Sequence, residues 1–350
     1  MDFEPLEAAA RAALPPMAFD YFAGGSDDEA TLADNVASWR RIRLRPRVLR
    51  DVSLVDTATT VLGTPVALPV LVAPVGFQGM AHPGAETEAA RGTAAAGSLY
   101  IASTVANTRL EDIAAVAGPR WMQVYVQKER SLTETMVKRA AAAGYTALVL
   151  TVDLPVVGRR RRDERNAFTL TPGLTVANFG VEMPSVVAGQ SGLAAQVGRD
   201  MDANLTPPDI AWLHEASGLP VLVKGVLRGD DARAAVDAGA AGVVVSNHGG
   251  RQLDTTISGA EALPEVVQAV GGDAEVYVDG GIRAGTDVLK AIAMGARAVL
   301  VGRPMVWSLA TGGAAGVEAM LKELQLELAN AMALCGAASV GDLTPDLLVP

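Results

Sequence analysis

The stretch GVVVSNHGGRQLD, residues 242–254, holds a short apolar run that stops abruptly in a polar, glycine-containing turn. Three consecutive valines are too few for a helix and are typical of a buried strand. The turn carries His248, which can exchange a proton near neutral pH, and Arg251, which can hold a carboxylate through two hydrogen bonds. A backbone-satisfied turn histidine is the alternative, which the flanking Ser-Asn, glycines and Arg disfavour. The stretch predicts a site at the carboxyl end of a parallel strand.

Working outward, further apolar runs rich in β-branched residues repeat along the chain. The candidate strands lie at 68–73, 98–103, 121–126, 146–152, 219–224, 242–246, 275–279 and 297–301. Most gaps hold Ala-rich helical patterns, at 86–96, 133–143, 230–238 and 286–294. Alternating strands and helices predict an α/β fold. A doubly wound open sheet is the alternative, but regular units with polar residues at most strand ends favour a (β/α)8 TIM barrel over residues 66–350.

The first 65 residues do not share this rhythm and are expected to form an N-terminal helical arm and a cap. Residues 1–40 have the pattern of short helices, and Ser26 before Asp27-Asp28-Glu29 is typical of an N-cap followed by an acidic first turn. Residues 41–65 are basic and then β-branched, which indicates a small layer over one end of the main fold. We therefore expect residues 1–350 to form a single domain.

The gap between Val152 and Leu219 is far longer than an ordinary loop in such a fold. Within it, residues 172–206 are rich in Gly, Ser, Ala and Pro, which fits a disordered linker, a lid or a partner-binding insertion. We expect a long lid-like loop over the strand ends, spanning residues 156–212.

Composition excludes several classes of protein. The formal charge of −10 disfavours a nucleic-acid partner. Cys335 is the only cysteine, so no intramolecular disulfide is possible, and a reducing compartment fits. The acidic start lacks the apolar segment of a secretory signal, and no apolar run approaches the roughly 20 residues of a membrane span, so a cytoplasmic protein is expected. Three scattered histidines make a metal site unexpected.

Polar or glycine residues follow each candidate strand and give the candidate site. They are Pro74, Val75 and Gly76; Ser103; Gln123 and Tyr125; Thr151, Asp153 and Arg160; Lys224; Ser246, His248 and Arg251; Asp279, Gly281 and Arg283; and Gly302 and Arg303. The last two groups are typical of a phosphate site, since phosphate in barrels commonly binds after strands 7 and 8. No Gly-x-Gly spacing and no P-loop occurs, which favours a mononucleotide over NAD.

The nine residues SNHGGRQLD, 246–254, resemble the signature of the FMN-dependent α-hydroxy acid oxidase/dehydrogenase family, and the resemblance extends from about Phe19 to about Leu343. It implies FMN as cofactor and oxidation of an L-2-hydroxy acid to the 2-oxo acid, with oxygen or another compound as electron acceptor. In this reading His248 takes either the α-proton or the hydroxyl proton. The resemblance also implies a homotetramer.

The resemblance further implies a role for each candidate residue. The flavin ring would be held by the backbone at 74–76, Ser103, Gln123, Thr151 and Lys224, the ribityl chain would face Ser246 and Asp279, and the phosphate would bind to Gly281, Arg283, Gly302 and Arg303. The substrate carboxylate would bind to Arg160, Arg251 and Tyr21, and the substrate hydroxyl would contact Tyr125. The base would be His248, paired with Asp153. From the residues alone, Tyr21 is predicted to be a packed aromatic of the helical arm, and only the resemblance assigns it to the substrate.

Two positions depart from the pattern of the glycolate oxidases. Gly76 stands where many oxidases have alanine and resembles several dehydrogenases and a monooxygenase, which leaves the oxidant open. Val105 stands where glycolate oxidases have tryptophan, which favours a medium or aromatic hydroxy acid. Oxidative decarboxylation by a monooxygenase, a non-redox flavin isomerase and a binding barrel are the alternatives.

Overall fold

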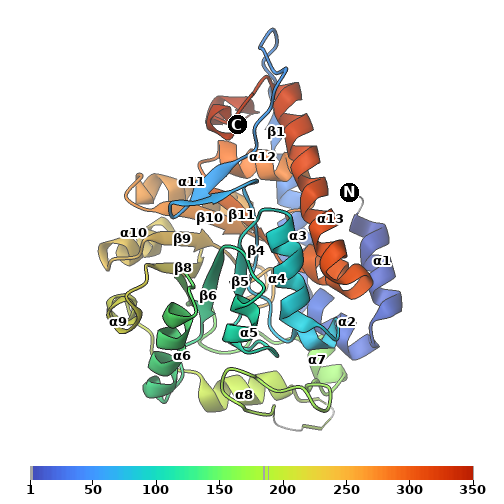
Figure 1. Cartoon of the computed structure of the whole chain (residues 1–350), viewed down its shortest axis with the longest axis vertical. Helices are drawn as coiled ribbons and strands as arrows, with labels where there is room; N and C mark the ends of the chain where they lie inside the picture. The colour runs from blue at the N-terminus through green and yellow to red at the C-terminus, as the bar shows by residue number, and fades with distance from the viewer. Residues whose placement is uncertain (1–2, 184–185, 188, 350) are drawn as a thin grey trace.

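The structure is a computed structural model that describes residues 3–183, 186–187 and 189–349. Its centre is a closed barrel of parallel strands in the order β10-β11-β4-β5-β6-β7-β8-β9 (Figure 1). The strands are β4 (Val70–Val72), β5 (Tyr100–Ala102), β6 (Arg120–Val124), β7 (Leu148–Thr151), β8 (Val221–Val226), β9 (Gly242–Val245), β10 (Glu275–Asp279) and β11 (Ala298–Val301). Each begins and ends within two residues of a predicted strand, so the predicted (β/α)8 barrel is confirmed.

Helices connect these strands and surround the barrel. They are α4 (Ala85–Ala95), α5 (Leu110–Ala114), α6 (Arg130–Ala142), α9 (Pro208–Ser217), α10 (Gly229–Asp237), α11 (Gly259–Val270), α12 (Gly285–Ala293) and α13 (Arg303–Cys335). Short 3-10 turns lie at η1 (Gln78–Met80), η2 (Val340–Asp342) and η3 (Pro345–Leu347). The strands are buried on both faces because helices cover the outside and side chains fill the inside, which explains their continuous apolar sequence. No helix in the described part of the chain combines the length and apolarity needed to cross a membrane.

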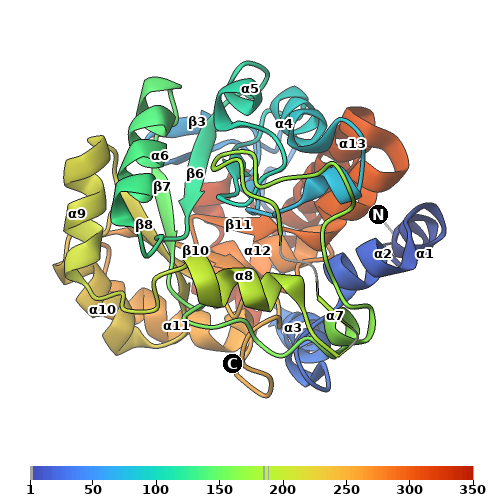
Figure 2. The same cartoon turned by 90° about the horizontal axis from the view of Figure 1, so that it is seen from below.

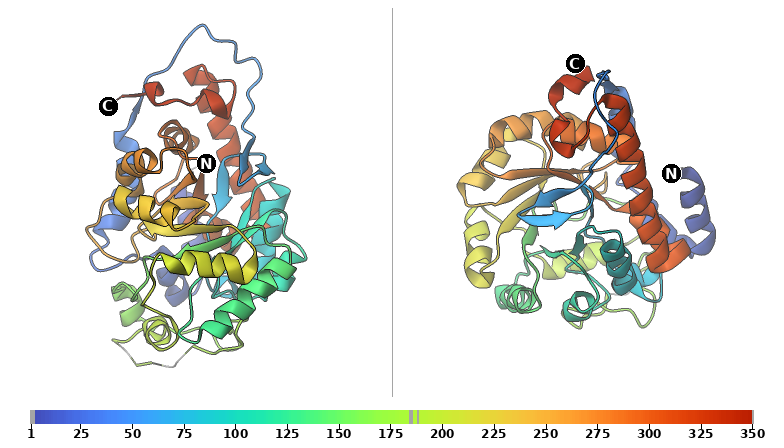
Figure 3. Two further views of the ribbon diagram at one scale, coloured as in Figure 1. Left: turned by 90° about the vertical axis from the view of Figure 1, so that its left-hand side faces the viewer. Right: turned by 45° about the horizontal axis from the view of Figure 1, so that its top comes forward.

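A hairpin covers the amino-terminal end of the barrel (Figure 3). Its strands are β2 (Thr59–Val61) and β3 (Thr64–Val66), and its valines pack with the inward side chains of the barrel. The Leu62 N–H donates to the Glu275 carboxylate at the start of β10, at 2.9 Å. Nearby, β1 (Arg43–Leu44) pairs antiparallel with β12 (Leu348–Val349). The cap predicted for residues 41–65 therefore exists and leaves the opposite end of the barrel for a site.

The N-terminal arm consists of α1 (Phe3–Ala13), α2 (Pro16–Ala23) and α3 (Ala30–Arg41). The prediction that Ser26 caps α3 is wrong, because the helix begins later and Glu29 before it has a left-handed backbone, φ 63°. The carboxylate of Asp254 instead accepts the backbone N–H groups of Asp28 at 3.1 Å and of Thr31 at 2.8 Å. Ser26 does not cap the helix and bonds elsewhere, since its backbone N–H donates to the carbonyl oxygen of Gly250 at 2.9 Å.

The long segment after β7 contains α7 (Arg161–Arg165) and α8 (Gly192–Asp200). Figure 2 shows α8 lying across the carboxyl-terminal mouth of the barrel. Its side chains at 193 and 197, with residue 201, line the cleft beneath. The described part of the predicted 156–212 loop therefore covers the mouth and includes a helix, which argues against a disordered linker; residues 184–185 and 188 lie outside the described part.

Candidate active site

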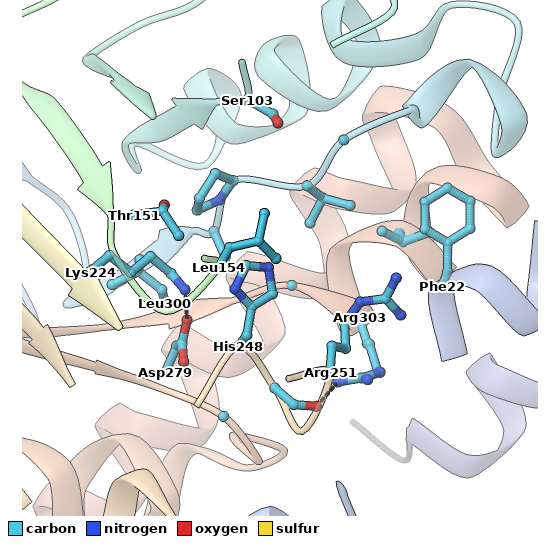
Figure 4. Close-up of a pocket in the computed structure, with 18 of the residues that line it drawn as sticks. Phe22, Ser103, Thr151, Leu154, Lys224, His248, Arg251, Asp279, Leu300 and Arg303 are labelled. Atoms are coloured by element: carbon cyan, nitrogen blue, oxygen red, sulfur yellow. Dashed lines mark hydrogen bonds and ion pairs between the residues drawn. The ribbon is translucent and has the colours of Figure 1, made fainter. Parts of the chain in front are cut away.

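A deep cleft opens at the carboxyl ends of the barrel strands, with an empty volume of about 1150 Å³ that includes solvent at its mouth. Each barrel strand contributes lining residues from its carboxyl end or from the loop that follows it; Lys224 lies within β8 and His248 in the turn after β9 (Figure 4). The predicted residues that line the cleft are Tyr21, Pro74, Val75, Gly76, Ser103, Tyr125, Thr151, Arg160, Lys224, His248, Arg251, Asp279, Gly281, Arg283, Gly302 and Arg303.

The His248 imidazole is paired with the carboxylate of Asp153. Its Nδ1 lies 3.0 Å from Asp153 Oδ1, and its Nε2 lies 3.5 Å from the Tyr125 hydroxyl. Burial lowers the pKa of His248 below its ordinary value, although Asp153 acts in the opposite direction. Burial is the largest effect on Asp153 and would raise its pKa, but the interactions with His248 and Lys224 and the hydrogen bonds together outweigh burial, and the pKa is lowered. At neutral pH the pair is therefore a neutral imidazole on a carboxylate, which is the state of a general base.

The turn that presents His248 has an unusual backbone. His248, Gly249 and Gly250 follow one another with φ of 59°, 64° and 75°. A left-handed run of this kind needs glycines, and the one non-glycine residue in it is the histidine, as strained residues at functional sites often are. The Ser246 hydroxyl accepts the His248 N–H at 3.0 Å, which holds the start of the turn.

Two guanidinium groups, of Arg160 and Arg251, lie at one end of the cleft. Arg251 Nη1 donates to the carbonyl oxygens of Gly24, at 3.0 Å, and Tyr21. Burial, reinforced by the charge of Arg251, lowers the pKa of Arg160 to about 10. Both groups are still charged at neutral pH, and their repulsion is relieved when an anion binds between them.

Tyr21 reaches this end of the cleft from α2 of the arm. Its ring stacks on Phe168 with centroids 4.4 Å apart, and the Arg251 guanidinium lies 4.8 Å from its centroid. Burial raises the pKa of Tyr21, so the phenol stays protonated and can donate. Tyr21 is thus a packed aromatic that also lines the cleft, and its contact with a substrate carboxylate stays a prediction.

A buried lysine forms the opposite wall. Lys224 Nζ lies 3.0 Å from Asp279 Oδ2 and donates to the Ser246 hydroxyl at 2.8 Å (Figure 4). Burial disfavours its charge, but Asp279 and Asp153 outweigh burial and the pKa of Lys224 is raised. A permanent cation therefore stands at this wall, where it can stabilise negative charge on a bound ring.

Two predicted residues, Gln123 and Ser246, lie behind the cleft wall. Gln123 Nε2 donates to the Thr151 hydroxyl at 3.1 Å, and its Oε1 accepts from the Thr104 N–H at 3.0 Å. Ser246 is fully buried beside Lys224. In this structure both residues contact the side chains that line the cleft.

Arg283 and Arg303 line the cleft beside the glycine turns that follow β10 and β11, and Arg303 lies close to Arg251, since both donate to the carbonyl oxygen of Gly24. Burial lowers the pKa of Arg283 to about 10 and lowers that of Arg303 well below its ordinary value. Arg303 donates to the carbonyl oxygens of Gly24, at 2.8 Å, and Gly249, at 2.9 Å. Among the described residues Arg303 bonds to carbonyl oxygens and to no carboxylate, which is typical of a buried cation at an anion site.

These residues fit FMN in three respects. The Asp279 Oδ1 atom is buried without a hydrogen-bond partner among the described residues, as expected of an acceptor for a ribityl hydroxyl. The guanidinium groups of Arg283 and Arg303 match a phosphate, and the backbone at 74–76 offers a wall that a flat ring can approach. The chemistry of the cleft therefore agrees with the cofactor that the sequence predicts.

The comparison with known protein families agrees with this geometry. A family model described as FMN-dependent dehydrogenase matches residues 10–350. The chain belongs to this family. An L-lactate oxidase from Nostoc sp. is 49% identical over 98% of this chain and 96% of its own, and glycolate oxidase 1 from Zea mays is 48% identical over 97% and 92%. This member of the family is thus an FMN-dependent enzyme that oxidises 2-hydroxy acids.

Solved structures of the FMN-dependent dehydrogenase family include close matches. A crystal structure of mandelate oxidase with (S)-4-hydroxymandelic acid superposes with a TM-score of 0.96, at 45% identity over 99% of this chain and 98% of the other. A second, of mandelate oxidase with (S)-2-phenylpropionate, has a TM-score of 0.90 at 44% identity. The barrel fold is therefore shared with proteins that bind aromatic acids.

Several residues that shape the cleft were not predicted. Leu193, Val197 and Met201 line it from the α8 segment, and their spacing of four residues is a helical signal within the Gly-rich stretch. Asn35 and Asp254 hold the arm against the His248 turn from outside the cleft. Asp254 lies within the stretch quoted first, but only the structure shows that its carboxylate caps a helix more than 200 residues away.

Proposed function

We propose that the enzyme oxidises (S)-2-hydroxy acids and passes the electrons to oxygen, and that the residues above carry out this reaction. The observation that carries the proposal is the convergence of a neutral imidazole paired with a carboxylate, two guanidinium groups and a buried lysine on one cleft at the mouth of the barrel. Oxygen is chosen as acceptor because the relatives named above are oxidases. Residues 1–350 would act as one domain.

Substrate binding is assigned to Arg160, Arg251 and Tyr21. The two guanidinium groups supply charge and fixed donors for a carboxylate, and the protonated Tyr21 phenol supplies a further donor. An anion in this place relieves the repulsion between the two arginines, so a substrate without a carboxylate loses most of its binding. The clamp thus orients the hydroxylated carbon toward His248.

Proton removal is assigned to His248. Asp153 holds Nδ1, which leaves Nε2 to accept a proton from the substrate carbon or from its hydroxyl group. The carboxylate then stabilises the imidazolium that forms. The Tyr125 hydroxyl, 3.5 Å from Nε2, is placed to contact the substrate oxygen, and burial raises the pKa of Tyr125 so that it stays a donor.

FMN binding is assigned along the length of the cleft. The ring would lie against Pro74, Val75, Gly76, Ser103, Gln123, Thr151 and Lys224, the ribityl chain against Ser246 and Asp279, and the phosphate against Gly281, Arg283, Gly302 and Arg303. When bound, FMN supplies the acceptor for the two electrons that the substrate loses. Lys224, charged and buried, favours negative charge at its end of the ring.

Gly76 favours a second candidate for the fate of the electrons. A Cβ atom at this position would lie 2.5 Å from Val105 Cγ2, so alanine requires Val105 to move. The glycine resembles that of dehydrogenases and a monooxygenase in the family. Oxidative decarboxylation, or a dehydrogenase with an acceptor other than oxygen, is therefore the alternative.

The test is anaerobic reduction of the purified holoenzyme by L-lactate, glycolate and (S)-mandelate, read as bleaching of the flavin absorbance. Bleaching by at least one acid, followed by oxygen uptake and a 2-oxo acid product, supports the proposal. A product one carbon shorter identifies the decarboxylating alternative, and bleaching without oxygen uptake identifies the dehydrogenase. Unchanged absorbance with every acid contradicts the function.

Substrate size is predicted from Val105, which lines the cleft as a small side chain. Val105→Trp should reduce kcat/KM for (S)-mandelate at least tenfold while leaving glycolate within a few-fold, because the indole fills space that only a bulky substrate uses. The measurement is the ratio of the two kcat/KM values at equal FMN content. An unchanged ratio would show that the side chain of the substrate does not lie near Val105.

Assembly and location complete the proposal. A homotetramer is expected from the family resemblance, and the exposed apolar side chains of Val48, Leu49 and Leu54 offer a surface for contacts. A cytoplasmic location is expected from the single cysteine. Sedimentation of the holoenzyme tests the first expectation and cell fractionation tests the second.

A further inference from the structure

Two buried amides join the arm to the His248 turn. Asn35 Nδ2 of α3 donates to Asn247 Oδ1 at 3.0 Å, and Asn247 Nδ2 donates to Asn35 Oδ1 at 2.8 Å. Both residues are almost fully buried. Within this pair each amide donates one hydrogen bond and accepts one. An aspartate at position 35 has no N–H to donate and an aliphatic side chain has neither group, so neither can reproduce the pair.

Asn247 in turn closes the strained segment. Its Oδ1 also accepts the Gly250 N–H at 3.1 Å, and its Nδ2 also donates to the Ile257 carbonyl oxygen at 3.1 Å. These bonds span His248 and Gly249, whose backbones are left-handed. Asn247 therefore bridges the turn, and Asn35 supplies two of the four hydrogen bonds that hold the Asn247 amide in this orientation.

The same part of α3 lies against the turn assigned to the phosphate. A Cβ atom at Gly281 would fall 1.8 Å from the Asn35 carbonyl oxygen, and one at Gly280 would fall 3.3 Å from Asn35 Oδ1. One helical turn later, Trp39 Nε1 donates to the Gly280 carbonyl oxygen at 2.8 Å. Asn35 thus stands between the histidine turn and the glycine turn, in contact distance of both.

We propose that Asn35 is a positioning residue for the reaction: through Asn247 it holds His248 against Asp153 and sets the base relative to the phosphate end of the cleft. The inference rests on the proposed function for its kinetic part, because it assumes that His248 is the base. Asn35 itself does not line the cleft. Its effect on the reaction passes entirely through the two turns.

The kinetic test compares Asn35→Ala and Asn35→Asp with Ser38→Ala. Ser38 is a buried neighbour on the same helix whose hydroxyl bonds only to α3 carbonyl oxygens among the described residues, so it is the matched control. We expect the Asn35 variants to lower the rate of flavin reduction by about 10- to 100-fold at equal FMN content, with a smaller change in substrate affinity. Ser38→Ala should keep the wild-type rate. The double variant Asn35→Ala/Asn247→Ala should lose no more of the flavin-reduction rate than Asn247→Ala alone, which would confirm that Asn35 acts through Asn247.

The second readout needs no turnover. The chain has three histidines, so ring-labelled protein gives few signals to assign, and His82 and His214 serve as internal controls. The groups that act on His248 are Asp153, Lys224, Arg160 and the Tyr125 hydroxyl. Burial is the largest effect on its pKa, so loosening the turn should raise the pKa of His248 toward the ordinary value in Asn35→Ala.

The outcomes separate the two proposals. If the pKa of His248 is unchanged in Asn35→Ala, and activity falls only in proportion to the amount of folded protein, then Asn35 is a structural residue and the inference is overturned. If Asn35→Ala does not fold, the same reading is taken from Asn35→Asp, which keeps the size of the side chain. A wild-type enzyme that no 2-hydroxy acid reduces contradicts the proposed function, while the titration still decides the role of Asn35.

Discussion

His248→Ala should bind FMN normally and fail to be reduced by any 2-hydroxy acid. The substitution removes the proton acceptor whose Nδ1 lies 3.0 Å from Asp153, and it leaves Lys224, Arg283 and Arg303 in place. Loss of a positioned general base typically costs about 10²- to 10⁴-fold in rate. The measurement is single-turnover reduction under anaerobic conditions, with FMN content read from the absorbance spectrum.

The matched control is His214→Ala, since His214 is exposed and bonds through Nδ1 to the carbonyl oxygen of Leu219, far from the cleft. This variant should be reduced at the wild-type rate. In the wild type, burial lowers the pKa of His248 below the ordinary histidine value of about 6.5, so the imidazole is still neutral at that pH. We therefore expect kcat/KM to fall with acid only below about pH 6.5. Normal reduction of His248→Ala would remove His248 from the reaction.

Arg251→Met should weaken substrate binding far more than it slows the reaction of bound substrate. The methionine keeps much of the apolar stem but loses the charge and the donors, and a hydrogen bond to a charged group is worth roughly 1.5–3 kcal/mol, or about 10- to 150-fold in affinity. The reduction rate measured against substrate concentration gives the dissociation constant and the limiting rate separately. FMN should stay bound, because the phosphate end keeps Arg283 and Arg303.

Arg159→Met is the control for this change, because Arg159 precedes Arg160 but is exposed and pairs with Glu164 at 3.0 Å. It should leave the dissociation constant unaltered. A fall in FMN content in Arg251→Met would place its charge with the cofactor. An unchanged dissociation constant would mean that Arg160 and Tyr21 bind the carboxylate without it.

The barrel was predictable because its signals are local. Most strands are short, mainly apolar runs buried on both faces, and the helices between them show their own period. The start of α3 was not predictable, because the carboxylate that caps it belongs to Asp254, in a distant part of the chain, and no local sequence pattern indicates that hydrogen bond. The helix α8 was hidden because Leu193, Val197 and Met201 are sparse among small and polar residues.

The candidate site shows the same division. Position after a strand was enough to gather His248, Asp153, Arg160 and Arg251, since the carboxyl ends of barrel strands meet at one mouth. Tyr21 needed the family resemblance, because nothing local tells a cleft-lining tyrosine from a packed one. Asn35 was missed altogether, since its partner Asn247 lies 212 residues away and an asparagine within a helix has no distinguishing pattern.

The way the arm is attached has a consequence for building chimaeras from relatives. Residues 16–41 contact the 246–254 stretch through Asp254, Asn247 and Gly250, and contact the 279–283 turn through Trp39. These three segments are far apart in the gene, but their contacts require that all three come from the same parent protein. Recombinants that take all three from one parent should remain active, whereas a crossover between the arm and the barrel should produce folded barrels with a misaligned mouth.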